Sequence, residues 1–312
     1  MPIIIKNNSS KEITSLVKNK IINQEIVALP TETVYGLAGL GTSLRAAKKI
    51  YKLKGRPIHK KLIFHCSDLK MVEKFCDLND ENLILAKKFW PGPVTLILKR
   101  KSKKIPKNLT KNNLCAVRIP KNTFTLNLID KIKYPVVMPS ANRFKRLSPI
   151  NAKMVFDQFL NTNLIIIDDK KCKVGLESTL IKVLNNKVEI LRPGKINMEN
   201  IKKILPYIES IKKKSNKSFS GSSKKHYSPQ KKLYLNKSQI KKKSAFINFG
   251  KNKKNQFKNL SNKGSLIEAA KNLYHYIFLA DKNKMYSSIS IAPIPNKGIG
   301  IAINDRLKRA SR

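Results

Sequence analysis

Four positive side chains and four hydroxyls are spaced along this chain so that they fall on successive predicted strand ends and loops. The cations are Lys54, Arg56, Arg118 and Arg192, and the hydroxyls are Thr33, Ser140, Ser148 and Ser178. Such a set holds anionic groups and stabilises charge, with arginine as a bidentate donor and lysine as a point charge. The sequence contains no convincing nucleophile–base triad, Walker loop or metal-ligand cluster. We therefore predict a site for positioning and charge stabilisation rather than covalent catalysis.

The stretch 29–38 reads Leu-Pro-Thr-Glu-Thr-Val-Tyr-Gly-Leu-Ala and follows a short β-branched run. Pro30 fixes its own φ and disfavours a helix at the residue before it, and Gly36 permits close packing of the backbone. Two hydroxyls, a carboxylate and a phenol lie between them. An ordinary strand-to-helix turn would explain Pro-Thr-Glu alone. The whole stretch favours a ligand-binding loop.

Lys54 and Arg56 stand one residue apart at the predicted end of a helix. A solvated last turn, favoured by the helix dipole, would explain this pair without any ligand. A strand over 62–65 follows at once, however, and would set both cations on a loop beside a sheet edge, where they can clamp a triphosphate. His65 ends that strand, and a lone histidine in this place is more often structural.

Arg118 lies within the otherwise apolar strand 115–120. A buried charge is costly unless it is paired. We therefore expect Arg118 to meet an anionic ligand, and a buried Asp or Glu partner is the alternative.

Hydrophobic periodicity predicts the elements that would position these residues. Helices are predicted over 10–22, 43–53, 68–76, 80–89, 151–160 and 197–211. Ser10 and Ser43 are the predicted N-caps of the first two helices. Strands are predicted over 26–28, 62–65, 94–98, 115–120 and 164–168, with a hairpin of 180–184 and 187–191. Together these elements predict an α/β fold.

Six motifs over about 165 residues resemble, in order and spacing, those of the YrdC family, the threonylcarbamoyl-AMP synthases. They are Pro-Thr-Glu-Thr-Val-Tyr-Gly-Leu (30–37), Lys54-x-Arg56, Val-Arg-Ile-Pro (117–120), Ser140-x-Asn142, Ser148-Pro149 and Leu-Arg-Pro-Gly (191–194). Two positions depart from the family pattern: Leu114 replaces a threonine, and Arg143-Phe144 replaces Ser-Gly. At the first of these positions the chain lacks the side-chain hydroxyl of the family pattern, and at the second we expect a differently shaped loop.

The resemblance implies a YrdC-like twisted mixed sheet with flanking helices. It also implies a synthase that forms threonylcarbamoyl-AMP and pyrophosphate from L-threonine, bicarbonate or CO₂, and ATP. L-threonine would be held by Thr33, His65, Arg118 and Ser178. ATP would be held by Lys54, Arg56, Ser140, Asn142, Ser148 and Arg192, with Lys54 and Arg56 as the catalytic residues. Mg²⁺ would arrive on the triphosphate, and no residue is assigned to a metal. The product would pass to a separate transferase that makes threonylcarbamoyladenosine in tRNA.

The resemblance extends to the long, two-domain members of the family. Residues 1–211 are predicted to form the YrdC-like catalytic domain, 212–232 a Lys- and Ser-rich linker, and 233–312 a smaller α/β domain. His226 and Tyr227 in the linker match a family element that reaches back over the active site, and a disordered spacer is the equally weighted alternative. The small domain is predicted to contain strands over 245–249 and 289–292 and helices over 264–279 and at the C-terminus.

The formal net charge is +46, from 65 Lys and Arg against 19 Asp and Glu. This charge predicts affinity for polyanions, including weak, non-specific tRNA binding at low salt. Lysine supplies 55 of the 65 cations and is spread along the whole chain, so coding bias explains most of the charge better. An alternative function is a basic RNA-binding module of the YrdC-like fold without synthase activity. A third is carbamoyl adenylation for metallocentre maturation, whose YrdC-like domains normally sit in larger chains with zinc-finger motifs.

The four cysteines are scattered without a Cys-x-x-Cys pair, which favours reduced thiols. No run of about 18 apolar residues occurs, and the N-terminal apolar run is too short for a secretory signal. We therefore expect a cytoplasmic protein without a membrane segment.

Overall fold

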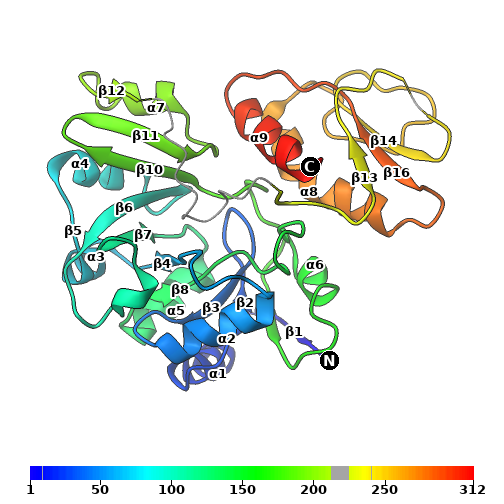
Figure 1. Cartoon of the computed structure of the whole chain (residues 1–312). Coiled ribbons are helices and arrows are strands. Elements are labelled where there is room, and N and C mark those ends of the chain that lie inside the picture. The colour runs from blue at the N-terminus through cyan, green and yellow to red at the C-terminus, as the bar shows by residue number, and fades with distance from the viewer. Residues whose placement is uncertain (9, 212–224, 240) are drawn as a thin grey trace.

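The computed structural model describes residues 1–8, 10–211, 225–239 and 241–312. Within these ranges, a large part is built on a twelve-stranded mixed sheet and a smaller part on a four-stranded parallel sheet (Figure 1). The predicted α/β class, with a large mixed sheet and flanking helices, is confirmed. Of the predicted linker, residues 212–224 lie outside the described residues.

The large sheet brings the ends of distant segments to one edge. Its order is β1-β9-β2-β3-β8-β4-β7-β6-β10-β11-β12, with β5 paired to β6. Strands β4 and β7 are parallel neighbours, and their register pairs His65 with Arg118. The strands are β1 (Ile3–Lys6), β2 (Val27–Leu29), β3 (Gly36–Leu40), β4 (Ile63–His65), β5 (Cys76–Asp77), β6 (Val94–Arg100), β7 (Leu114–Arg118), β8 (Val136–Val137), β9 (Ile165–Asp168), β10 (Thr179–Leu184), β11 (Lys187–Arg192) and β12 (Glu209–Ser210).

The helices of the large part begin at side-chain caps that satisfy free backbone N–H groups. Ser10 Oγ accepts from the N–H of Ile13 at 3.2 Å and Ser43 Oγ from that of Ala46 at 3.1 Å, as predicted. Asn79 caps the fourth helix, where its side chain accepts from the N–H of Asn82. The helices are α1 (Lys11–Ile22), α2 (Leu44–Lys54), α3 (Leu69–Phe75), α4 (Asp80–Phe89), α5 (Thr123–Ile132), α6 (Ala152–Phe156) and α7 (Met198–Lys202), with a 3₁₀ turn at Lys107–Leu109.

The predicted helix over 197–211 is wrong in its second half. Helix α7 ends at Lys202, and the chain then turns into the edge strand β12. Pro206 explains the difference, because proline cannot donate to a helical hydrogen bond and restricts the residue before it. The extra strand pairs with β11 and extends the sheet.

The small part places two helices against the large part. Its parallel sheet has the order β13-β16-β14-β15, and in Figure 1 helices α8 and α9 lie on the side that faces the large sheet. Buried apolar residues of both parts join into one contiguous cluster. The elements are β13 (Lys232–Tyr234), β14 (Ser244–Asn248), β15 (Lys258–Asn259), β16 (Ser288–Ile291), α8 (Leu266–Lys282) and α9 (Gly300–Ala310).

A close backbone approach at Gly175 joins the two parts. The N–H groups of Val174 and Gly175 donate to the carbonyls of Glu32 and Thr33, at 2.8 and 3.2 Å, so this segment packs on the predicted ligand-binding loop. On its other side, Gly175 faces the backbone of α8.

None of the helices in the described ranges is long and apolar enough for a membrane crossing.

Substituting Gly175 with alanine should weaken the contact between the two parts. The φ of Gly175 is +81°, and a Cβ there would lie 2.5 Å from the carbonyl oxygen of Ala270 and 2.6 Å from Cα of Lys271. We expect Gly175→Ala to lower the free energy of unfolding by about 2–4 kcal/mol, measured by urea denaturation.

Gly250→Ala is the matched control, because Gly250 has a φ of +89° but no atom within 4 Å of the added Cβ. It should cost only the conformational strain, about 1 kcal/mol. If both variants lower the free energy of unfolding by the same amount, the close contact between Gly175 and α8 does not explain the loss.

Candidate active site

The predicted ligand-binding loop, residues 30–35, connects the antiparallel strands β2 and β3 and is buried throughout. Its own hydroxyls hold it: Thr31 Oγ1 donates to the carbonyl of Val34 at 2.6 Å, and lies 2.8 Å from Thr33 Oγ1. At Gly36 a Cβ would lie 2.2 Å from Cγ of Met138, so only glycine fits at the end of the loop. The loop is therefore rigid and fixes the position of Thr33.

A cavity opens beside this loop at the edge of the large sheet. Six of the predicted site residues line it: Thr33, His65, Arg118, Ser140, Ser178 and Arg192. Four others, Lys54, Arg56, Asn142 and Ser148, are buried behind the cavity wall and do not line it. The structure thus brings the predicted residues together in two layers, an inner one at the cavity and an outer one that supports it.

Arg118 has the buried acidic partner that the sequence offered as the alternative, and it also lines the cavity. Its Nη2 lies 2.5 Å from Oε1 of Glu32, and both side chains are at most 7% exposed. Its Nη1 donates to Thr33 Oγ1 at 2.8 Å and its Nε to the carbonyl of Gly92 at 3.0 Å. These contacts orient the guanidinium beside the cavity.

His65 is a neutral imidazole at the same edge. Its Nδ1 lies 3.3 Å from the carbonyl of Ile63, which favours the tautomer with the proton on Nδ1. Burial, and then the charge of Arg118, lower the pKa of His65 to about 3. The unprotonated Nε2 can therefore accept a hydrogen bond at neutral pH.

Lys54 supports the cavity wall from behind. Its ammonium donates to the carbonyl of Ser140, to the carbonyl of Asn142 at 2.6 Å and to Oδ1 of Asn142 at 3.4 Å. Burial, and then the charge of Arg56, hold the pKa of Lys54 well below its usual range. Ser140 Oγ donates to Asn142 Oδ1 at 2.6 Å, so one short loop is fixed at both of its ends.

Where the family pattern has Ser-Gly, this chain has Arg143-Phe144, and both residues form hydrogen bonds that hold the loop against α2. Nη1 of Arg143 donates to the carbonyl of Leu53, near the end of α2, at 2.7 Å. The N–H of Phe144 donates to the carbonyl of Lys54 at 2.8 Å. The loop that carries Ser140 and Asn142 is thereby tied to α2. The other departure, Leu114, begins β7 and does not line the cavity.

Arg56 is held by its own loop. Its guanidinium donates to the carbonyl of Lys60, from Nε and Nη2 at 3.1 Å each, and to the carbonyl of Lys61 at 3.0 Å. Burial lowers the pKa of Arg56 to about 10, so the side chain stays charged at neutral pH. In this conformation Arg56 shapes the loop between α2 and β4.

Ser178 and Arg192 form the opposite wall of the cavity. Arg192 donates from Nε to the carbonyl of Ser178 at 3.1 Å and from Nη2 to its hydroxyl at 3.0 Å. The Ser178 hydroxyl also lies 2.6 Å from Thr95 Oγ1. Because Ser178 precedes β10 and Arg192 ends β11, the predicted hairpin positions both residues.

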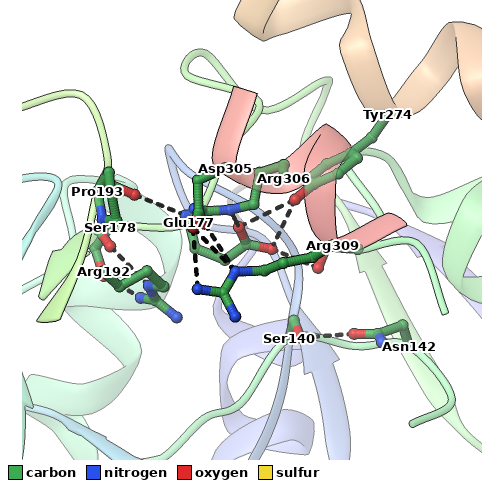
Figure 2. A network of polar contacts seen from close by, with 11 residues as sticks. Ser140, Asn142, Glu177, Ser178, Arg192, Pro193, Tyr274, Asp305, Arg306 and Arg309 are labelled. Carbon is green, nitrogen blue, oxygen red and sulfur yellow. Dashed lines mark hydrogen bonds and ion pairs between the residues drawn. The ribbon is translucent and has the colours of Figure 1, made fainter. Parts of the chain in front are cut away.

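Glu177, which the sequence motifs leave unassigned, is the centre of a polar network that joins the two parts of the protein (Figure 2). Its carboxylate accepts from Ser148 Oγ at 2.5 Å, from Tyr274 Oη at 3.2 and 3.4 Å, and from Arg306 Nε at 2.8 Å. Two signals in the sequence point here: a carboxylate next to Ser178, and an arginine in a lysine-dominated chain. Ser148 is fully buried and donates to Glu177, and its predicted contact with ATP stays a prediction.

His226 and Tyr227 pack against the site rather than into the cavity. The ring of Tyr227 stacks on that of Tyr274, with centroids 5.8 Å apart, and the guanidinium of Arg306 lies 5.1 Å from the Tyr227 ring centre. The ring of His226 meets Tyr227 edge-on at 3.9 Å. Burial, against which the charge of Glu177 acts only partly, lowers the pKa of His226 to about 3. Both residues are ordered and buried, which disagrees with a disordered spacer at these two positions.

The residues that line the cavity are suited to binding anions next to the neutral imidazole of His65, which can accept a hydrogen bond. Arginines lie on two walls of the cavity, and hydroxyls lie between them.

The four cysteines are all buried. Across the described ranges, no group of three or more His, Cys, Asp or Glu side chains lies close enough to hold a metal ion.

Two family models together cover nearly the whole chain. The Sua5_yciO_yrdC model, described as "Telomere recombination", matches residues 19–194, and the model "Threonylcarbamoyl-AMP synthase, C-terminal domain" matches residues 196–312. The threonylcarbamoyl-AMP synthase of Pyrococcus abyssi is 31% identical over 92% of this chain and 90% of its own length. That of Bacillus subtilis is 30% identical over 92% of this chain and 89% of its own length.

Solved structures agree with these matches. The crystal structure of Pyrococcus abyssi Sua5 in complex with L-threonine superposes with a TM-score of 0.89, at 28% identity, over 100% of this chain and 97% of that one. The Escherichia coli YciO structure shares the fold alone, with a TM-score of 0.56 at 18% identity, over 64% of this chain and 98% of that one. The resemblance seen in the sequence motifs is confirmed, and the chain belongs to the threonylcarbamoyl-AMP synthase family in its long form with a second, C-terminal domain.

Proposed function

We propose that this protein joins L-threonine, bicarbonate or CO₂, and ATP into threonylcarbamoyl-AMP, with release of pyrophosphate. The observation that carries the proposal is the convergence of Thr33, His65, Arg118 and Ser178 on the cavity that Ser140 and Arg192 also line. The family resemblance assigns the first four residues to threonine and the last two to ATP. One cavity therefore offers both groups side by side, as an adenylation requires.

In the proposal, threonine binds between the loop 30–35 and strand β7. Arg118, already oriented by Glu32 and Gly92, binds the threonine carboxylate. The neutral His65 accepts a hydrogen bond through Nε2 from the hydroxyl or the amine of threonine. The likeness to a relative whose crystal structure contains L-threonine supports this placement.

ATP binds on the other side of the cavity, against Arg192 and Ser140. Lys54 and Asn142 act on ATP by fixing the loop of Ser140, and Ser148 acts through Glu177. The assignment of Lys54 and Arg56 as catalytic residues stays a prediction, since in this conformation both donate to backbone carbonyls behind the cavity wall. Mg²⁺ enters as part of the nucleotide substrate, bound to its phosphates.

The chemistry needs orientation and charge stabilisation. The threonine amine nitrogen attacks the carbon of CO₂ and loses a proton, which gives a carbamate. An oxygen of this carbamate then attacks the α-phosphorus of ATP, and the bond to pyrophosphate breaks. The guanidinium groups around the cavity stabilise the negative charge that gathers on the phosphates in this step.

We propose that the protein acts as a nucleotidyltransferase, because the reaction transfers AMP to the carbamate, and that it acts in the cytoplasm. We propose that its product is consumed by a transferase that attaches the threonylcarbamoyl group to adenosine in tRNA. An RNA-binding module without synthase activity is the competing function, and the net charge of +46 is its only support.

Pyrophosphate release separates these two functions. Purified protein with MgATP should release pyrophosphate only when L-threonine and bicarbonate are both present, because the carbamate must form before the α-phosphate is attacked. A coupled pyrophosphate assay with each co-substrate omitted in turn measures this. No release in the complete mixture, together with salt-dependent RNA binding, would contradict the synthase.

Arg118→Lys should reduce kcat/KM for threonine by roughly 10²-fold, because lysine keeps the charge opposite Glu32 but loses the planar fork that binds a carboxylate. Arg100→Lys is the matched control. Arg100 lies on β6, bonds Asn113 and Ile105, and does not line the cavity. If the two variants keep the same kcat/KM, Arg118 does not bind threonine.

Acid should destabilise the protein through its two buried histidines. His65 and His226 have a pKa of about 3 when folded and 6.5 in the unfolded chain. Between these values the unfolded chain binds more protons, so the free energy of unfolding falls as the pH drops below 6.5, by about 1.4 kcal/mol per pH unit for each histidine.

Urea denaturation of the native protein and of His226→Phe at pH 7.5 and 5.5 tests this. The variant should lose about half of the pH dependence that His65 and His226 cause together. An unchanged dependence would show that the pKa of His226 is the same in the folded and the unfolded chain, which contradicts the prediction.

A further inference from the structure

Glu177 lies between two guanidinium groups that come from different parts of the protein. Arg306, on α9 of the small part, donates to Oε2 of Glu177 at 2.8 Å. Arg192, at the end of β11, lies on the other side in Figure 2, where it donates to Ser178. Burial alone would raise the pKa of Glu177, but the charge of Arg306 and then that of Arg192, with the bond from Ser148, lower it to about 2. Glu177 is therefore an anion that both arginines stabilise.

Arg306 is fixed in this place by contacts on every side. Besides Glu177, it donates from Nη1 to Asp305 at 2.8 Å and from Nη2 to the carbonyl of Pro193 at 2.8 Å. The aromatic ring of Tyr227 lies against its guanidinium. Arg306 is only 1% exposed and does not line the cavity, so it acts on bound molecules only through its neighbours.

We propose that Arg306 is a positioning residue of the nucleotide site: it holds the Glu177 carboxylate, so that this carboxylate does not draw Arg192 away from the anionic substrate. The inference rests on the proposed function, in which Arg192 binds ATP. It gives the small part a role in the chemistry of the large part, carried by one side chain.

The competition follows from the cost of a buried, unpaired carboxylate. If Arg306 is removed, Glu177 keeps only hydroxyl donors, from Ser148 and Tyr274. The two other cations whose charges act on Glu177 are Arg192 and Lys54. The ammonium of Lys54 is used by the loop of Ser140 and Asn142. Arg192 is then the guanidinium that Glu177 attracts, and the charge available to the phosphates of ATP falls.

The test compares Arg306→Met with the double variant Glu177→Gln/Arg306→Met in the full-length protein. Losing one charge-assisted contact to ATP should raise its KM and its Kd about tenfold or more in Arg306→Met, with a smaller change for threonine. Glutamine at 177 has no charge to compete for Arg192. The double variant should therefore recover ATP affinity to within about threefold of the native value.

Lys308→Met is the matched control, because Lys308 lies exposed on the same helix, and its KM for ATP should stay native. If Arg306 only builds the interface, the double variant will be as impaired as the single one, which would overturn the proposal. Removing both charges of a buried pair is tolerated better than removing one. The double variant therefore decides the question even if Arg306→Met does not fold, since a tenfold loss of ATP affinity in it contradicts the proposal.

ATP binding measured by calorimetry separates this proposal from the synthase reaction. If the native protein binds ATP but releases no pyrophosphate with threonine and bicarbonate, the proposed function fails while the effect of Arg306 on ATP affinity is still measured. If the native protein turns over and Arg306→Met folds with unchanged ATP affinity, only the role of Arg306 is wrong.

Discussion

Five buried positive side chains surround one cavity, and the rest of the structure depends on how their charges are satisfied. Lys54, Arg56, Arg118, Arg192 and Arg306 are each at most 6% exposed. A cation removed from water needs oxygen acceptors close by. Most of them here are backbone carbonyls of loops, those of residues 60, 61, 92, 140, 142, 178 and 193. In regular strands and helices the backbone carbonyls already accept hydrogen bonds from backbone N–H groups. The carbonyls that meet these cations therefore come from the loops around the cavity.

The acceptors solvate this charge without cancelling it. Glu32 pairs with Arg118 and Glu177 with Arg306, whereas the oxygens that meet Lys54 and Arg56 belong to carbonyl groups. Neutral oxygens stabilise a cation locally but leave its field in place, and that field is strong where water is excluded. The cavity therefore keeps a positive potential that suits a carboxylate on one wall and phosphates on the other. The same balance makes each carboxylate important, because an anion released from its own partner competes with the substrate.

Local rules predict what depends on neighbouring residues, and they fail where distant segments meet. The caps Ser10 and Ser43 and the site residue Arg118 follow from short patterns, whereas His65 is assigned to the site through the family resemblance. The ligand contact predicted for Lys54 stays a prediction, since in this conformation Lys54 donates to the carbonyls of Ser140 and Asn142. The sequence alone does not tell whether the chain or a substrate supplies the oxygen acceptors that a buried cation needs. The pair of Glu177 and Arg306 spans 129 residues, and no local pattern relates its two members. Its position depends on the packing of α9 on the large part.

The choice between arginine and lysine carries information that the net charge does not. Lysine makes up 55 of the 65 cations, so a lysine at a given position is what the composition already leads one to expect. The four arginines around the cavity go against that trend, and each makes several directed bonds that the round ammonium of lysine cannot make from one position. At position 54 a lysine is sufficient, because the three protons of one ammonium can be donated to the oxygens of Ser140 and Asn142, which lie close together in one loop. Four of the ten arginines lie around the cavity, so the choice of arginine narrows the candidates without naming one, and it is the contact with Glu177 that identifies Arg306.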